Sequence, residues 1–183
     1  TINAKVGRDY GVQARGWLAG RKLELRAGVY QGNRGTDSRA PFRFAARGVV
    51  YPFEADTAMF YTGTTLGKRK LVAIGGGVDV QKDYAAWSTD AFVDWPVAKG
   101  DGVTLQADFL RWDGGTTFAS LPRQDCLLVE AGYYAHAWKV TPFVQYASRD
   151  YELASRADET RLQGGLAYWG NGHRWNVKLG LAK

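Results

Sequence analysis

Apolar and polar residues alternate along almost the whole chain. From Val103 to Phe109 every second residue is apolar, and the residues between them, from Thr104 to Asp108, are polar. The same two-residue period runs through 22–30 and through 173–182. Because successive side chains of a β-strand point to opposite faces, this period predicts strands with one apolar and one polar face. We therefore expect an all-β protein.

About ten segments carry this pattern, and most of them are nine to twelve residues long. Strands of soluble proteins are usually about five or six residues long, whereas a tilted strand needs roughly nine to eleven residues to cross a bilayer. The lengths predict a single antiparallel transmembrane β-barrel domain covering residues 1–183. The expected strands are 10–19, 22–32, 42–53, 71–81, 85–96, 102–113, 126–136, 139–149, 160–169 and 173–182.

The links between these segments alternate in length. Bacterial outer-membrane barrels have short periplasmic turns on one rim and longer external loops on the other. The short links are Ala19–Lys22, Ala98–Gly102, His136–Trp138 and Gly170–Gly172, and the long links are Gly32–Pro41, Asp113–Asp125 and Asp150–Glu159. The pair Asn171-Gly172 is a hairpin-turn signal. Two links break the alternation: Lys82–Asp83 is short, and Glu54–Lys70 is long enough to hold a short strand around 60–64.

Composition narrows the class further. No apolar run approaches the roughly 18 residues of a membrane-spanning helix, and the single Cys126 excludes a disulfide within the chain. Aromatic residues make up 14% of the chain, with seven Trp. The net charge of +6 is compatible with anionic solutes or lipids as partners. Nucleic acid is not an expected partner, because the basic residues are spread over many segments.

Placing the apolar positions against lipid assigns the polar positions to a water-filled lumen. A Lys or Arg facing lipid at mid-membrane would cost about 2–4 kcal/mol, so a wet lumen is the setting that accommodates these charges. The expected basic pore-lining residues are Arg15, Arg26, Arg43, Arg47, Arg161 and Lys178. The expected acidic ones are Glu24, Asp79, Asp90, Asp94, Asp108 and Glu130.

The tryptophans fall near the ends of the expected strands. Membrane barrels carry aromatic girdles at both lipid–water interfaces, and we expect all seven Trp to belong to such girdles. They are Trp17, Trp87, Trp95, Trp112, Trp138, Trp169 and Trp175. The alternative is that aromatic residues fill the core of a soluble β-sandwich.

Several stretches of the sequence resemble the bacterial outer-membrane porins of the phosphate-selective O/P type. They occur in order along nearly the whole chain, at Gly7–Gly16, Lys22–Arg34, Tyr61–Lys68, Val129–Tyr134, Asp158–Arg161 and Tyr168–His173. The resemblance implies a barrel of 16–18 strands in the outer membrane, usually a homotrimer, that passes phosphate-like solutes. Such barrels are about twice as long as this chain and usually end on an aromatic residue, whereas this sequence ends on Lys183. We therefore expect an incomplete barrel that lacks strands at both ends.

The sequence leaves two interpretations of the inward arginines open. Arg15, Arg26, Arg43 and Arg47 form a basic strip that favours anions, or they pair across strands with Glu24, Asp79 or Asp94. The function that we expect is passive diffusion of small hydrophilic solutes, with outer-membrane lipid and lipopolysaccharide as surroundings. We expect no enzymatic activity, cofactor or metal. The alternatives are a scaffold or anchor subunit of a larger cell-envelope complex and a soluble all-β ligand-binding barrel.

Overall fold

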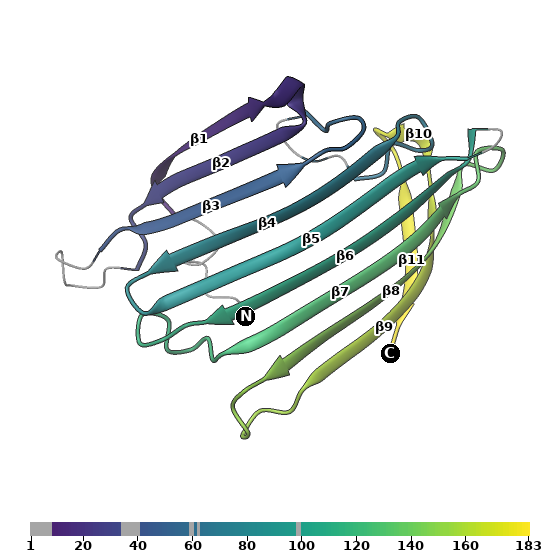
Figure 1. Cartoon of the computed structure of the whole chain (residues 1–183). Helices are drawn as coiled ribbons and strands as arrows, with labels where there is room; N and C mark the ends of the chain where they lie inside the picture. Colours follow the sequence, from purple (N-terminus) through teal and green to yellow (C-terminus); the bar gives the residue numbers. More distant parts are fainter. Residues whose placement is uncertain (1–8, 34–40, 59–60, 62, 98–99) are drawn as a thin grey trace.

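The protein is all-β, and its strands form one antiparallel sheet. The structure, a computed structural model, describes residues 9–33, 41–58, 61, 63–97 and 100–183 (Figure 1). Ten strands lie side by side in the order β1-β2-β3-β4-β5-β6-β7-β8-β9-β11. From β1 to β9 each strand pairs with the next in the chain, and β9 pairs with β11 because the short β10 is not in this sheet. The predicted fold class, all-β and antiparallel with about ten strands, is confirmed.

The strands are β1 (Gly11–Leu18), β2 (Leu23–Tyr30), β3 (Arg43–Val50), β4 (Leu71–Gln81), β5 (Tyr84–Pro96), β6 (Gly102–Asp113), β7 (Gln124–Tyr134), β8 (Val140–Tyr151), β9 (Glu159–Tyr168), β10 (Gly170–His173) and β11 (Val177–Ala182). Strands β4 to β9 have 10 to 13 residues, close to the predicted lengths, whereas β1, β2 and β3 have eight residues each and β11 has six, fewer than predicted. A short 3₁₀ turn, Ala19–Arg21, connects β1 and β2. None of the described residues form a helix with the length and apolarity to cross a membrane.

The last hairpin differs from the predicted one. The backbone N–H of Arg174 donates to the carbonyl of Asn171, which centres the turn on Gly172 and His173 and not on the Asn171-Gly172 pair. Gly172 takes the left-handed conformation there, with φ of 54°. The residues up to His173 form the short strand β10, and β11 begins only at Val177, four residues later than the start predicted from the pattern.

The sheet is open. Its two edges are β1 and β11, which pair with β2 and β9 respectively and not with each other. Closure into a barrel is therefore not a property of the described residues. Figure 1 shows the strands running obliquely side by side, with links at two opposite ends of the sheet. We call the end that carries the links 19–22, 51–70, 97–101, 135–139 and 169–176 the first rim, and the opposite end the second rim.

The strand register separates the side chains into two faces. Arg15 lies opposite Arg26, which lies opposite Arg47, so these three arginines form one row across β1, β2 and β3. On β5 and β6, Asp90 lies opposite Asp108 on the same side of the sheet. We call this side the polar face. The side with the intervening residues, such as Leu25, Ile74 and Leu105, is the apolar face, and its large side chains are exposed.

Candidate functional site

Two arginines on the polar face converge on one carboxylate. Glu24 on β2 has no exposed surface, and the Nε atom of Arg15 donates to its Oε1 at 2.7 Å. Arg26 donates through Nε to the same oxygen. The hydroxyl of Tyr51 donates to the other oxygen, Oε2, at 3.2 Å. A buried carboxylate is stable only when it is paired and hydrogen-bonded, which these three partners achieve.

The other two arginines of the predicted strip are also paired. The Nε atom of Arg43 donates to Asp79 at 2.7 Å. Arg47 makes two parallel bonds with Asp90, of 2.6 and 2.7 Å. The bidentate arrangement is the strongest geometry for such a pair. All four arginines therefore contact a carboxylate, and the strip is not a row of unpaired cations.

Of the two interpretations that the sequence left open, pairing across strands is the one seen for Glu24 and Asp79. Asp94, the third carboxylate named in that interpretation, is in none of the ion pairs of the described residues. Its carboxylate has no exposed surface and accepts the backbone N–H of Thr65. The cross-strand partner of Arg47 is Asp90, which the sequence placed only among the acidic wall residues.

The remaining acidic wall residues are hydrogen-bonded to amides. The Nε2 atom of Gln106 donates to Asp108 at 2.6 Å, and that of Gln145 donates to Glu130 at 2.8 Å. The ammonium of Lys178 on β11 lies 5.4 Å from the centre of the Trp169 ring. All of these residues except Asp108 belong to a hollow of about 450 Å³ that follows the polar face from β5 to β11, lined by Phe92, Gln106, Glu130, Gln145, Gln163 and Lys178 among others.

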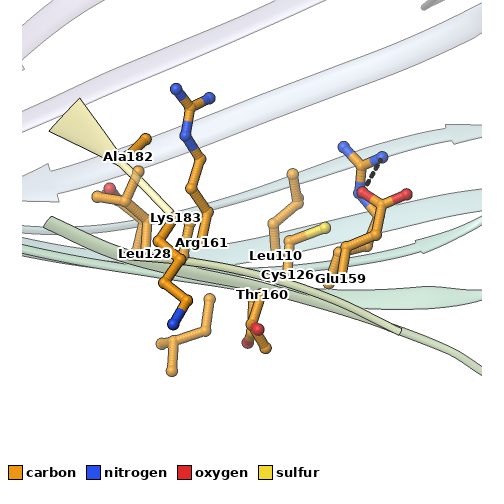
Figure 2. Close-up of a pocket in the computed structure, with 13 residues that line it drawn as sticks. Leu110, Cys126, Leu128, Glu159, Thr160, Arg161, Ala182 and Lys183 are labelled. Carbon is orange, nitrogen blue, oxygen red and sulfur yellow. Dashed lines mark ion pairs between the residues drawn. The ribbon is translucent and has the colours of Figure 1, made fainter. Parts of the chain in front are cut away.

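Arg161 lies on the same face near the open edge of the sheet. It lines a hollow of about 720 Å³ together with Asp108, Cys126 and Lys183. Figure 2 shows Arg161 and Glu159 rising from one side of β9, with Thr160 on the other side. The alternation predicted from the sequence therefore holds on β9 as well. Glu159 is held by Arg149 at 3.6 Å, the ion pair that is dashed in the figure.

The long link 51–70 lies on the polar face beside the first rim. Arg15 donates through Nη1 to the carbonyl of Ala58 at 2.7 Å, and the Tyr61 ring lies 4.8 Å from the guanidinium carbon of Arg26. Further along, Nε2 of His173 lies 2.9 Å from the carbonyl oxygen of Thr64. Leu66 is buried in one cluster with Tyr134, Ala167 and Trp169. The link thus reaches from β1 and β2 to the β9–β11 connection.

Glu54 joins the two ends of this link through hydrogen bonds. Its carboxylate accepts the backbone N–H of Lys70 at 2.8 Å and Nε of Arg69 at 3.0 Å. The bond from the Lys70 backbone, which has the larger effect, and the bond from Arg69 hold the pKa of Glu54 below its usual value. A short strand was predicted around 60–64. Phe60 and Thr62 lie outside the described residues, while Tyr61, Gly63 and Thr64 are not in a strand.

A loop of the second rim also packs onto the polar face. Phe118 is buried against Tyr84 and Ala86, with the rings of Phe118 and Tyr84 at 4.8 Å. Asp83, in the short link between β4 and β5, accepts bonds from the hydroxyls and backbone N–H groups of Thr116 and Thr117. The threonine hydroxyls, followed by the backbone N–H of Thr116, lower the pKa of Asp83 well below its usual range.

The seven tryptophans do not form one outward set. Trp87 on the apolar face is 43% exposed, and in links of the first rim Trp138 and Trp175 are 76% and 55% exposed. Trp95 also lies on the apolar face, where its ring contacts Phe53 at 5.0 Å between centroids. For these four the girdle assignment stays a prediction.

The other three tryptophans lie on the polar face, so their assignment to a girdle was wrong. Trp17 packs against the cluster of Val49, Tyr51 and Leu71, and Trp112 packs against the cluster of Tyr84 and Phe118. Trp169 is 5% exposed, and its Nε1 donates to Thr141 at 2.9 Å. Each of them shares the parity of the polar positions, which directs the ring toward the links that fold over that face.

The apolar face carries an uncharged band with aromatic residues at both borders. Trp87 and Trp95 lie eight residues apart on β5, and the apolar-face residues between them are Thr89, Ala91 and Val93. The equivalent positions of β6, β7 and β8, matched by the strand register, are likewise uncharged. Charged residues begin at the row of Trp87, where Nε of Arg111 donates to Asp125 at 2.6 Å.

The height of this band follows from its length along β5 and the tilt of the strands. Eight residues of a strand extend about 27 Å at about 3.4 Å per residue. A tilt of about 40° reduces the height to about 21 Å, close to the roughly 25 Å apolar band of outer-membrane barrels. Beyond Trp95, the ammonium of Lys70 lies 5.4 Å from its ring centre, and the hydroxyl of Tyr133 donates to Asp101 at 2.6 Å. Charged side chains thus border the uncharged band at the first rim as well.

Comparison with protein-family models, with curated proteins and with solved structures finds no match.

Proposed function

We propose that the sheet is part of the wall of an outer-membrane channel of the porin type, through which small hydrophilic solutes diffuse passively. The apolar face contacts lipid, and the polar face lines a water-filled lumen. The mechanism involves no covalent step: the wall replaces part of the hydration that a solute loses as it enters. The resemblance to phosphate-selective porins of the O/P type points to the same class and, as in those porins, to a homotrimer.

The observation that carries this proposal is the inverted distribution of side chains. In the described strands the large apolar side chains are exposed on one face, whereas paired charged residues such as Arg47 and Asp90 lie partly exposed on the other. A soluble protein rarely exposes a contiguous apolar surface of more than a few hundred Å². A lipid environment removes this cost, and a hydrated lumen accommodates the charges.

A soluble ligand-binding barrel fits these observations less well. Such a barrel would place polar residues on the outside of at least some strands. On β2, β3 and β11 the apolar-face positions carry no charged residue at all, from Leu25 and Phe44 to Leu181.

The open edges set a condition on the proposal. Unpaired backbone groups are not tolerated in the hydrocarbon region of a bilayer, so β1 and β11 must be paired in the membrane. Further strands of a larger barrel supply that pairing in this account.

The pairing of the arginines supports weak rather than strong ion selectivity. The predicted wall residues comprise six basic and six acidic side chains, and the four arginines of β1 to β3 each contact a carboxylate. An anion that passes along such a wall meets paired charges. These attract it less than a row of unpaired guanidinium groups would.

The test is single-channel recording in planar bilayers, with reversal potentials measured in a salt gradient. We expect stepwise conductance and a reversal potential near zero. Stable membrane insertion without any conductance would contradict the channel and favour the scaffold alternative. A protein that stays in solution without detergent and does not insert would contradict the membrane assignment itself.

A further inference from the structure

The link 51–70 and the polar face enclose a cavity beside the first rim. Its volume is about 490 Å³, within the range of roughly 300–1,000 Å³ that is typical of small-molecule sites. The link contributes Tyr51, Asp56, Tyr61 and Gly63, and the strands contribute side chains from β3, β4, β5 and β6. The lining residues that matter for recognition are Arg47, Tyr61, Asp90, Phe92, Gln106 and Asp108.

The polar groups of this cavity are held in fixed positions by one another. Arg47 and Asp90 form the bidentate pair, and the amide of Gln106 donates to Asp108 at 2.6 Å. Asp90 lies opposite Asp108 across β5 and β6. The wall therefore presents planar donors and acceptors side by side, each of them with hydrogen-bonding capacity left after the internal bonds are made.

Aromatic and aliphatic surface completes the cavity. Phe92 lies opposite Gln106 on the neighbouring strand, so a ring stands beside the row of polar groups. Tyr61 is 44% exposed, and the buried Val49 and Leu71 belong to the same lining. An apolar wall with a few fixed polar groups is the usual composition of a small-molecule site.

The charges of the lining exclude an anion as the preferred ligand. One guanidinium, that of Arg47, faces the carboxylates of Asp56, Asp90 and Asp108. An organic cation is disfavoured as well. Arg47 neutralises Asp90, Asp56 is 5% exposed and already accepts the backbone N–H of Ala58, and Asp108 already accepts the amide of Gln106. Vicinal hydroxyl groups suit both kinds of partner, because a hydroxyl donates to a carboxylate and accepts from a guanidinium or an amide.

We propose that this cavity binds a neutral polyhydroxylated solute of the size of one or two sugar rings. The hydroxyl groups bond to Arg47, Asp90, Gln106 and Asp108, and the C–H face of the ring packs on Phe92. This inference rests on the proposed function, because a solute reaches the cavity through the lumen. It adds a binding step to what is otherwise passive diffusion.

The experiment is current block in planar bilayers, using the whole protein with glucose or maltose as the probe. We expect the sugar to reduce the conductance in a saturable way, with no saturable block by inorganic phosphate or lysine at equal concentration. The half-blocking concentration rises about tenfold in Phe92→Leu, which removes a packing face of the ring. It rises by a similar factor in Asp108→Asn, since the carboxylate is then lost as an acceptor. Phe44→Leu, on the exposed apolar face, leaves it unchanged.

The outcomes separate this proposal from the channel proposal. Three results in a conducting channel contradict the sugar site alone. They are equal block by sugar in all variants, no block by sugar, and saturable block by phosphate or lysine instead. If the protein does not conduct, the channel proposal fails, and titration calorimetry of maltose into the detergent-solubilised protein decides on the site. A heat of maltose binding that is lost in Phe92→Leu and kept in Phe44→Leu supports the site. The absence of a binding heat in the parent protein overturns it.

Discussion

Arg47 and Asp90 face each other on the polar face through two hydrogen bonds of 2.6 and 2.7 Å. The two residues lie on β3 and β5, on either side of the glycine-rich β4. Gly75 of β4 makes this contact possible, because a Cβ atom there would lie 2.6 Å from Nη2 of Arg47 and 3.0 Å from both carboxylate oxygens of Asp90. The glycine thus lets two charges on non-adjacent strands neutralise each other.

The first prediction concerns ion selectivity. Asp90→Asn leaves the Arg47 guanidinium without its carboxylate, so the wall gains one uncompensated positive charge. We expect the reversal potential in a KCl gradient to shift toward that of chloride. The matched control is Asp125→Asn, which breaks the pair with Arg111 on the apolar face and should leave the reversal potential unchanged. Equal shifts in the two variants would mean that the two faces have been assigned wrongly.

The second prediction concerns stability at Glu24. Glu24→Gln leaves Arg15 and Arg26 without the carboxylate on which both converge, in a place where the Glu24 side chain has no exposed surface. Breaking a buried ion pair in this way costs about 3–5 kcal/mol, and we expect a loss of the order of 3 kcal/mol in urea unfolding followed by Trp fluorescence.

The control for that measurement is Glu159→Gln. The side chain of Glu159 is 64% exposed and lies 3.6 Å from Arg149, so solvent screens the pair. We expect little change in the free energy of unfolding. Similar losses in both variants would contradict the special role of Glu24.

The third prediction concerns the packing of Leu66, which holds the 51–70 link against the first rim. Leu66 is 6% exposed within the cluster of Tyr134, Ala167 and Trp169. In the proposed channel the link lies over the polar face and so narrows the lumen. Leu66→Ala leaves a cavity that costs about 2–5 kcal/mol, so the link detaches more often from the first rim and the single-channel conductance rises. Leu153→Ala, at a side chain that is 49% exposed in a link of the second rim, is the control and should conduct like the parent protein. A correctly folded Leu66→Ala channel with unchanged conductance would show that the link does not narrow the lumen.

The fourth prediction concerns pH at the second rim. The pKa of Asp83 is lowered in the folded protein by its bonds to Thr116 and Thr117. A lowered folded pKa means that the carboxylate stabilises the loop fully above its unfolded pKa, and that this contribution is lost only as the pH falls through the lower folded value. We expect the amide protection factors of Thr116 and Thr117 to persist at pH 4 and to fall in stronger acid.

The variant Asp83→Asn tests the same bonds at neutral pH, where it should reduce both protection factors. Asp158→Asn is its control, because Asp158 accepts the backbone N–H of Tyr151 in a different link. Protection of Thr116 and Thr117 that is unchanged in Asp83→Asn would refute the role of Asp83 as the acceptor.

The strands and their two faces were predictable because both follow from a local two-residue period. The predicted segments 71–81 and 102–113 coincide with β4 and β6. The wrong placement of Trp17 was also avoidable from the sequence, since Trp17 lies two residues after Arg15 and therefore shares its face. Parity along the strand, and not closeness to a strand end, decides which face a ring lies on, and the same holds for Trp112 and Trp169.

The pairing of charges and the path of the links were not predictable in this way. The choice of Asp90 rather than Asp94 as an arginine partner depends on register across three strands and on the absence of a side chain at Gly75. The contacts of Tyr61 and Leu66 join residues more than thirty positions apart in the sequence. The one available signal was that Glu54–Lys70 is far too long for a turn at a rim of short links.

The central claim is that one face of the sheet meets lipid and the other meets water. Nitroxide labels placed singly from Val103 to Phe109 on β6, in a Cys126→Ser background reconstituted in vesicles, test it residue by residue. We predict that accessibility to oxygen peaks at Val103, Leu105, Ala107 and Phe109, and that accessibility to a water-soluble nickel complex peaks at Thr104, Gln106 and Asp108. Accessibilities without this two-residue period, or with the opposite phase, would contradict the account.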